Sequence, residues 1–320
     1  MNKRVRGNLS VRSILVAALA ALPMITLAPV SAQPPTTCGD GWESSEVVSG
    51  LGVLENLEPD GAGGFYLAGL ERGVIYHVDA ERRVTTVASG IDSPAGIRLV
   101  GDTLYFISGD SPEANLLNLP TGALNRLDLT TGTVEVLVDG LTAPNGLLLL
   151  PDGDLLFSWA VVVGPGTGVS RYSPATGTYT PNWAPVPSSN GLSLTPDRTA
   201  VYVSNSTTGS FYRVPLDAPG EYTTLPGGFG AIIEAPDDLQ ATATDQIYVA
   251  VNFSGKVSRY DPASGKTCDL STGMYTVNIP PGPTSVRIAP DGDRLALYVT
   301  ASTGSLYRLR PPSGVDLTPA

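Results

Sequence analysis

One position that recurs along this chain holds residue types that could bind a metal ion. A short pattern occurs six times, and aligning its copies superimposes Glu55, Ala95, Asn145, Asn190, Asp237 and Thr284. A position that serves only packing should hold similar residues in every copy, whereas this one holds two acids, two amides, an alanine and a threonine. Carboxylate and amide oxygens are the ligands that Ca²⁺ and Mg²⁺ prefer. The acid and amide members therefore predict a divalent-metal site formed by Glu55, Asn145, Asn190 and Asp237.

The spacing of these positions predicts the elements that must hold them. Successive copies lie 40, 50, 45, 47 and 47 residues apart, which is the period of a propeller blade. Runs of β-branched and aromatic residues, such as residues 199–204 and 247–251, indicate short strands. The 36 glycines and 28 prolines disfavour helices. We predict an all-β fold, a six-bladed β-propeller with four strands in each blade.

The two ends of the chain are predicted to meet in the last blade. Residues 44–56 have the pattern of an outer strand followed by a blade entry, yet no earlier blade precedes them. Placed as the outer strand of the sixth blade, this stretch would close the ring and remove an exposed sheet edge. In such a ring the loops that enter the innermost strands surround one mouth of the central channel, where the four candidate ligands would converge.

The identity of the ion follows from the donor set. Two carboxylates offset the charge of a divalent ion, and flexible entry loops suit Ca²⁺ better than Mg²⁺. The absence of imidazole and free thiols disfavours zinc and copper, although zinc or manganese at a weak oxygen site stays open. Asn or Asp before Gly is, on its own, a common turn residue. Two observations favour metal binding over this simpler reading. The four candidate ligands share one position of the repeat, and an unpaired Glu55 carboxylate that faces inward would be costly to bury.

With these residues in place, the chain resembles the family of senescence marker protein (regucalcin), gluconolactonase and luciferin-regenerating proteins, with diisopropyl fluorophosphatase as a more distant cousin. The resemblance implies a six-bladed propeller with a divalent ion, usually calcium, held by one Glu, two Asn and one Asp. Glu55 matches the Glu of the first blade and Asn145 the Asn of the third. Asn190 in SNGLSL matches the fourth-blade motif, and Asp237 in APDDL matches the fifth-blade motif.

The chain departs from the family pattern near the expected substrate. Gly146 and Ala143 stand where family members often carry an Asp and a basic residue, which argues against a sugar-acid lactone as substrate. Asn56 and Asp238 replace residues that are often glycine, so we expect these two polar groups to flank the ion or the substrate.

A histidine-based mechanism is not expected. The only histidine, His77, takes the repeat position that holds Arg126, Arg171, Arg213, Arg259 and Arg308 in the other copies, so we predict a structural role for it. No G-x-S-x-G nucleophile motif is present. Any catalysis must therefore depend mainly on the metal ion.

The leading hypothesis is an exported, calcium-dependent hydrolase of small esters, most plausibly a lactonase. Asp237, or a water molecule that it orients, would be the base or nucleophile, and Asp238 or Glu55 could share this role. The alternative from another class is a non-catalytic propeller in which the ion stabilises the channel mouth and the loops bind a ligand or protein. A condensing enzyme that resembles strictosidine synthase is a third possibility, but such enzymes normally lack this ligand set.

The remaining predictions concern location and partners. Residues 1–32 have the basic, apolar and small-residue regions of a signal peptide cleaved after Ala32, so we expect a secreted or periplasmic protein with one domain over residues 33–320. Removal of its four basic residues leaves 15 basic and 30 acidic residues, a net charge of −15. This charge disfavours nucleic acid as a partner, and no later apolar segment predicts membrane insertion. We expect a monomer that acts on a small-molecule ester or lactone.

The two cysteines, Cys38 and Cys268, are expected to form a disulfide. An exported chain with only two cysteines more often pairs them than leaves both free. Cys38 precedes the predicted closing strand of blade six, and Cys268 lies in the predicted outer strand of blade five, so the two could be neighbours.

Overall fold

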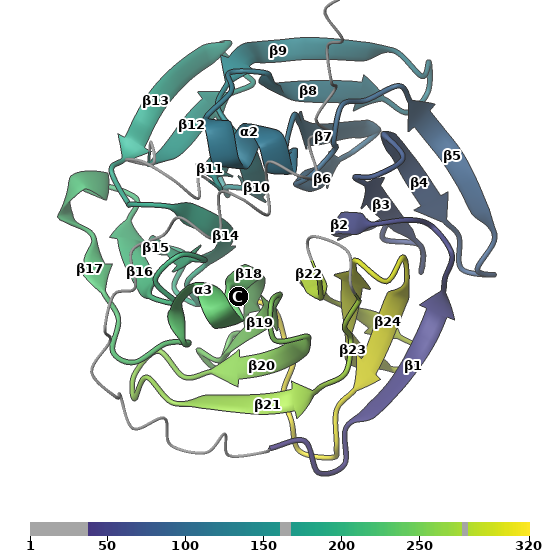
Figure 1. Ribbon diagram of the computed structural model, residues 1–320, viewed down its shortest axis with the longest axis vertical. Helices are drawn as coiled ribbons and strands as arrows, with labels where there is room; N and C mark the ends of the chain where they lie inside the picture. The colour runs from purple at the N-terminus through teal and green to yellow at the C-terminus, as the bar shows by residue number, and fades with distance from the viewer. Residues whose placement is uncertain (1–37, 161–167, 277–280) are drawn as a thin grey trace, which may run out of the picture. The chain divides into compact units, whose positions relative to one another are not determined.

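A computed structural model describes residues 38–160, 168–276 and 281–320. The predicted signal peptide, residues 1–32, lies outside these ranges. Residues Pro35–Ala320 form one compact unit. In the described part of the chain the strands form six four-stranded antiparallel sheets, which follow one another around a ring (Figure 1). The predicted six-bladed β-propeller is confirmed.

The first three blades are each built from consecutive strands. Blade one contains β2 (Leu54–Pro59), β3 (Phe65–Gly69), β4 (Val74–Val78) and β5 (Val84–Ser89). Blade two contains β6 (Ile97–Val100), β7 (Thr103–Ser108), β8 (Gly122–Asp128) and β9 (Val134–Leu141), with helix α2 (Pro112–Leu117) between β7 and β8. Blade three contains β10 (Pro144–Leu149), β11 (Leu155–Trp159), β12 (Val169–Ser173) and β13 (Thr178–Ala184).

Blades four and five repeat this order, and blade six uses both ends of the chain. Blade four contains β14 (Ser189–Leu194), β15 (Ala200–Asn205), β16 (Phe211–Pro215) and β17 (Thr223–Thr224), with the short helix η1 (Pro219–Glu221) before β17. Blade five contains β18 (Pro236–Ala241), β19 (Ile247–Val251), β20 (Lys256–Tyr260) and β21 (Thr267–Ser271), and helix α3 (Ala231–Glu234) precedes it. Blade six contains β22 (Pro283–Asp291), β23 (Arg294–Ala301), β24 (Leu306–Arg310) and β1 (Glu43–Val48).

The closure of the ring agrees with the sequence prediction. Strand β1 pairs antiparallel with β24, with Glu43 opposite Arg310 and Glu46 opposite Tyr307. The outer strand of blade six thus comes from the N-terminal side of the chain (Figure 1). The predicted disulfide is also present: Cys38 is bonded to Cys268 of β21, with their Cα atoms 5.6 Å apart. It covalently links the segment before β1 to blade five, across 230 residues of sequence.

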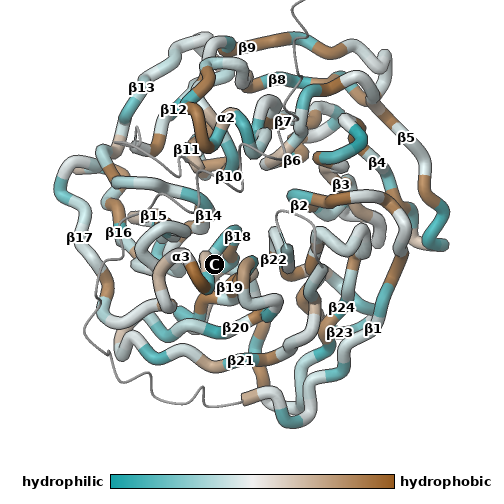
Figure 2. Tube along the Cα trace, in the orientation of Figure 1, coloured by the Kyte–Doolittle hydropathy of each residue, from teal (hydrophilic) through white to brown (hydrophobic). Residues whose placement is uncertain are grey.

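The packing between blades comes from one apolar position of each inner strand. Two residues after the candidate ligand position, the strands carry Leu57, Ile97, Leu147, Leu192, Leu239 and Val286, all of which are buried. Each of these residues belongs to a different apolar cluster. Because these side chains pack into the blades, neighbouring residues of the same strands are left to face the channel. Figure 2 shows hydrophilic stretches in β2 and β18 beside the centre of the ring.

A break in strand register directs the candidate ligands. The pairing of the inner strand shifts beside the ligand position in five blades, between Leu54 and Asn56, Pro144 and Leu147, Ser189 and Leu192, Pro236 and Leu239, and Pro283 and Ser285. A bulge of this kind lets two successive side chains depart from strict alternation, and such bulges are common next to active sites.

Candidate functional site

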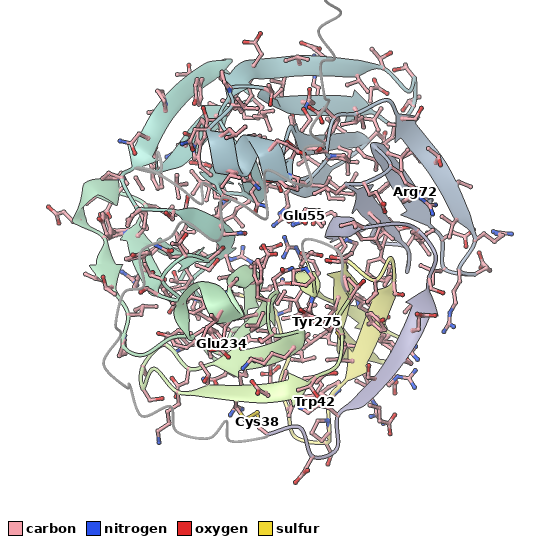
Figure 3. All side chains as sticks on the ribbon, viewed as in Figure 1. Cys38, Trp42, Glu55, Arg72, Glu234 and Tyr275 are labelled. Carbon is pink, nitrogen blue, oxygen red and sulfur yellow. A yellow bond between two sulfur atoms is a disulfide. The ribbon has the colours of Figure 1, made fainter. Side chains whose placement is uncertain are left out.

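The four predicted ligands are the second residues of their strands. Glu55, Asn145, Asn190 and Asp237 lie in β2, β10, β14 and β18, so the prediction that they occupy entry loops was wrong. The reason is the bulge: each strand begins one residue before the ligand position, and the ligand position is a residue that the pairing skips. All four are buried, with 5–7% of each residue exposed. Figure 3 places the Glu55 side chain near the centre of the ring.

Hydrogen bonds connect these side chains across blades. The Asn145 Nδ2 atom donates to Glu55 Oε1 at 3.2 Å, which joins blades three and one. It also donates to Asp110 Oδ2 at 2.7 Å. Asn190 hydrogen-bonds to the Asp237 carboxylate, which joins blades four and five. The structure therefore brings the four predicted residues into one cluster.

Asp110 is a member of this cluster that the sequence analysis missed. It follows β7 in blade two and has 3% of its surface exposed. Its carboxylate accepts hydrogen bonds from Asn145 and, at 3.0 Å, from Asn115 Nδ2. Ser111, the next residue, caps α2 by accepting from the Ala114 amide. The aligned position in blade two is Ala95, which has no polar side chain. Asp110 supplies a carboxylate from the same end of the β6–β7 pair, since its amide donates to the Ser93 carbonyl.

The cluster contains more negative charge than it can neutralise. Burial, and then the charge of Asp110, raises the pKa of Glu55 well above its ordinary value, although the hydrogen bond from Asn145 opposes this. Burial and the charge of Glu55 raise the pKa of Asp237 in the same way. Burial also raises the pKa of Asp110 to about 6. Glu55 and Asp237 are thus buried acids whose pKa values are raised further by nearby carboxylates, which indicates a place where a cation would be stabilised.

Two oxygens of the cluster also lack partners. Asn190 Oδ1 and Asp237 Oδ1 are buried and accept no hydrogen bond. An unsatisfied buried acceptor costs about 1–3 kcal/mol, and most such atoms in folded proteins are paired. Both atoms are of the type that a hard cation binds. The residues present thus fit a divalent ion held by Glu55, Asn145, Asn190 and Asp237.

This donor set differs from a purely acidic metal site. Among residues 38–160, 168–276 and 281–320, no group of three or more His, Cys, Asp and Glu side chains is arranged to hold a metal ion. The candidate site instead combines two carboxylates with two amide oxygens. The Asn145 amide donates through its nitrogen to two acids, so its oxygen is left for another partner.

Asn56 and Asp238, which were expected to flank the ion or the substrate, bond to each other and to residues of blade six. Asn56 Nδ2 donates to Asp238 Oδ2 at 2.9 Å, and Ser285 Oγ donates to the same atom at 2.6 Å. Arg287 forms an ion pair with Asp238 at 2.7 Å. Burial alone would raise the pKa of Asp238, but the charges of Arg287 and Arg98 lower it. Asp238 is therefore a weak base, and its predicted share in catalysis has no support from its environment.

Gly146, one of the departures from the family pattern, is required by the packing of the ring. A Cβ atom on Gly146 would lie 2.4 Å from the Asn190 carbonyl oxygen and 2.8 Å from Ser158 Oγ. The Gly146 amide donates to that Ser158 hydroxyl at 2.8 Å. An aspartate could not occupy this position without moving blade four. The neighbouring Ala143 is fully buried, so neither residue offers a polar group to a substrate.

His77 lies away from the cluster, on the face predicted from the repeats. It stands opposite Tyr66 in β3, as Arg126 stands opposite Tyr105 and Arg213 opposite Tyr202. Its Nε2 atom is 2.9 Å from Asp60 Oδ2. This pairing agrees with a structural role.

Comparisons with known proteins agree with the motif analysis. The family model described as SMP-30/Gluconolactonase/LRE-like region matches residues 161–303. Lactonase drp35 of Staphylococcus epidermidis is 27% identical over 220 residues, which are 64% of this chain and 65% of that protein. The corresponding protein of Staphylococcus haemolyticus is 26% identical over 220 residues, with the same coverage. The match thus spans slightly less than two thirds of the length of these curated relatives.

Solved structures show the same fold at low identity. A gluconolactonase of Xanthomonas campestris aligns with 89% of this chain and 97% of its own, with a TM-score of 0.66 and 16% identity. The calcium-binding protein regucalcin of Agrobacterium tumefaciens aligns with 87% of this chain and 95% of its own, also with a TM-score of 0.66 and 16% identity. The predicted resemblance is confirmed: the chain is a six-bladed propeller that is similar to the SMP-30, gluconolactonase and luciferin-regenerating proteins.

Proposed function

We propose that this protein is a calcium-dependent hydrolase of small esters, with lactones as the most plausible substrates. The observation that carries the proposal is the buried cluster of Glu55, Asp110 and Asp237, whose carboxylates have raised pKa values and whose Asp237 Oδ1 and Asn190 Oδ1 atoms lack partners. The likeness to Lactonase drp35 supports lactone hydrolysis as the reaction type. The regucalcin relative, described as calcium-binding, supports calcium as the ion.

In the proposed mechanism the ion and the side chains of the site have different roles. When bound, the ion supplies positive charge that polarises the ester carbonyl and stabilises the oxyanion. Asn145 and Asn190 would contribute neutral amide oxygens, so that two rather than four of the ligands carry negative charge. Asp237 would accept a proton from the attacking water molecule. Asp110 holds the Asn145 amide with its nitrogen toward the acids.

The walls of the site favour a substrate without a sugar-acid chain of hydroxyls. Gly146 and Ala143 give no hydrogen-bonding side chain, and the close approach of the Asn190 carbonyl prevents Gly146 from being replaced by one. A compact lactone or aryl ester satisfies its polar requirements through the carbonyl alone. We therefore propose a small substrate of limited polarity, bound by a monomeric protein.

Export is a separate part of the proposal. Residues 1–32 have the pattern of a signal peptide, and the Cys38–Cys268 disulfide agrees with an oxidising compartment. Calcium is abundant outside cells, which suits a site with only two formal charges. None of the helices in the described ranges has both the length and the apolar character needed to cross a membrane.

The experiment that tests this function is a hydrolysis assay with a panel of lactones and aryl esters. Each substrate is measured with added calcium and with chelator, for wild type, Asp237→Asn and the control Asp152→Asn, which makes the same change at an exposed carboxylate. We expect hydrolysis that requires calcium, is lost in Asp237→Asn and is retained in the control. Thermal stabilisation by calcium without hydrolysis of any substrate would instead identify a non-catalytic binding protein.

A further inference from the structure

A second ring of chemically varied side chains lies deeper in the channel. Three residues after each candidate ligand position, the inner strands carry Glu58, Arg98, Leu148, Ser193, Gln240 and Arg287. All six line one cavity of 340 Å³. At about 3.3 Å per residue, this ring lies roughly 10 Å along the strands from the candidate active site. Between the two rings lies the hydrogen-bonded group of Asn56, Asp238 and Ser285.

The charged members of this second ring occupy adjacent blades. Arg287 of blade six, Glu58 of blade one and Arg98 of blade two follow one another, while Leu148, Ser193 and Gln240 come from the three opposite blades. Arg98 and Arg287 have only 6% and 5% of their surface exposed. Two buried guanidinium groups on one cavity wall are costly unless anions compensate them.

The charge of Arg287 has a close carboxylate partner, whereas the charge of Arg98 does not. Arg287 has its ion pair with Asp238 at 2.7 Å. The ion pair of Arg98 with Glu58 measures 3.5 Å, which is longer than the 2.7–2.9 Å typical of a charge-assisted hydrogen bond. Burial and the charge of Arg287 lower the pKa of Arg98 to about 10. Arg98 thus donates a short hydrogen bond to the Ile97 carbonyl but makes only a long contact with the Glu58 carboxylate, and it lines the cavity.

The contacts that Glu58 makes are long, so another anion could replace it as the partner of Arg98. Its Oε1 atom accepts a long hydrogen bond of 3.3 Å from the Leu99 amide. Burial raises the pKa of Glu58, although Arg98 and Arg287 act against this.

We propose that this cavity is a second binding site, separate from the candidate active site, for a small organic carboxylate held between Arg98 and Arg287. Planar guanidinium groups bind carboxylates through paired N–H donors. Because Arg287 is already paired with Asp238 and Arg98 has only a long contact with Glu58, the pair offers the charge of about one guanidinium, which favours a monoanion over a dianion such as phosphate. Ser193 and Gln240 offer polar groups, and Leu148 an apolar surface, for a short hydroxylated or aliphatic remainder of the ligand.

The far wall of the cavity is held in place by main-chain contacts. Gln240 Oε1 accepts from the Ile288 amide at 2.7 Å, and Ser193 Oγ accepts from the Ala241 amide at 2.9 Å. A cavity of 340 Å³ with fixed polar groups falls within the usual range for small-ligand sites. The proposal goes beyond ester hydrolysis and does not depend on a metal ion at the other ring.

The test uses lactate as a monoanionic hydroxycarboxylate and inorganic phosphate as the comparison. Binding to the intact protein is measured by isothermal titration calorimetry in the presence of chelator, so that no cation at the first ring contributes. We expect saturable lactate binding that is at least tenfold tighter than phosphate binding. Absence of lactate binding, or tighter binding of phosphate, would overturn the proposal.

Two variants locate the binding within the cavity. Arg98→Gln should weaken lactate binding about tenfold or more, whereas Arg126→Gln, which changes an exposed arginine of the same blade, should leave it unchanged. Glu58→Gln removes a competing carboxylate with little change of shape and should tighten binding about fivefold. If Arg98→Gln does not fold, Glu58→Gln decides, because unchanged or weaker lactate binding in that variant contradicts the assignment.

Discussion

Asp237 and Asp238 are consecutive residues with opposite environments. They are similarly buried, with 7% and 3% of their surface exposed. Asp238 forms an ion pair with Arg287 and accepts hydrogen bonds from Asn56, Ser285 and a main-chain amide. The charges of Arg287 and Arg98 lower its pKa. Asp237 has an oxygen without a partner and acidic neighbours that, together with burial, raise its pKa. The difference shows that the chain neutralises one buried acid itself and leaves the other without a compensating positive charge.

Neutralising Asp238 should have the largest effect on stability. Asp238→Asn would leave Arg287 buried without its carboxylate, so we expect the free energy of unfolding to fall by about 3–5 kcal/mol. Denaturant titration of the variant against wild type measures this loss. A variant as stable as wild type would mean that the ion pair does not organise the channel.

The same change at Asp237 should act in the opposite direction. In chelator, Asp237→Asn removes a buried charge that has no cation, so we expect the free energy of unfolding to rise by about 1–3 kcal/mol. Asp152→Asn, at an exposed site, should change it by less than about 0.5 kcal/mol. Destabilisation of Asp237→Asn as large as that of Asp238→Asn would show that both acids have the same structural role.

A third variant tests whether packing fixes the ring beside the cluster. Gly146→Ala should destabilise the protein by about 1–3 kcal/mol, because the added methyl group would overlap the Asn190 carbonyl. Gly220→Ala is the matched control, since no atom lies within 4 Å of a Cβ at that position. Equal melting temperatures for the two variants would mean that blade four can move and that a polar residue is tolerated there.

The smallest expected effect concerns pH. The pKa of Asp110 is about 6 in the folded protein, above its ordinary value of 3.8. A raised pKa means that the folded state binds the proton more tightly, so in chelator the stability gained through Asp110 should appear as pH falls from 7 toward 4. Relative to Asp110→Asn, chelated wild type should therefore gain melting temperature between pH 7 and pH 5. Parallel melting curves for the two proteins would contradict this assignment.

The fold was predictable because it repeats. Six copies of one pattern predicted the blades, and the unpaired stretch before blade one predicted the closing strand that β1 forms with β24. The four ligand positions could also be found, since they share one column of the alignment. Their placement inside strands could not, because a bulge depends on pairing across strands and leaves no distinct residue signature.

The repeat pattern of the sequence did not predict the other parts of the site. Asp110 lies in the α2 insertion of blade two, which has no counterpart in the other copies, so no column revealed it. The residues of the second ring could have been found from the sequence. Glu58, Arg98, Ser193 and Gln240 share one position of the repeat alignment, and their residue types differ as much as those at the candidate ligand position. The network of Asn56, Asp238 and Arg287 joins three blades, and only the folded ring brings those residues together.

The most direct test is calorimetric titration of chelator-treated protein with calcium near neutral pH. Wild type and Asp152→Asn should each bind one calcium ion per chain at the cluster, and Asp237→Asn should lose that binding while it remains folded. Unaltered calcium binding in folded Asp237→Asn, or no binding in wild type, would contradict the proposal that the buried cluster of Glu55, Asn145, Asn190 and Asp237 binds a cation.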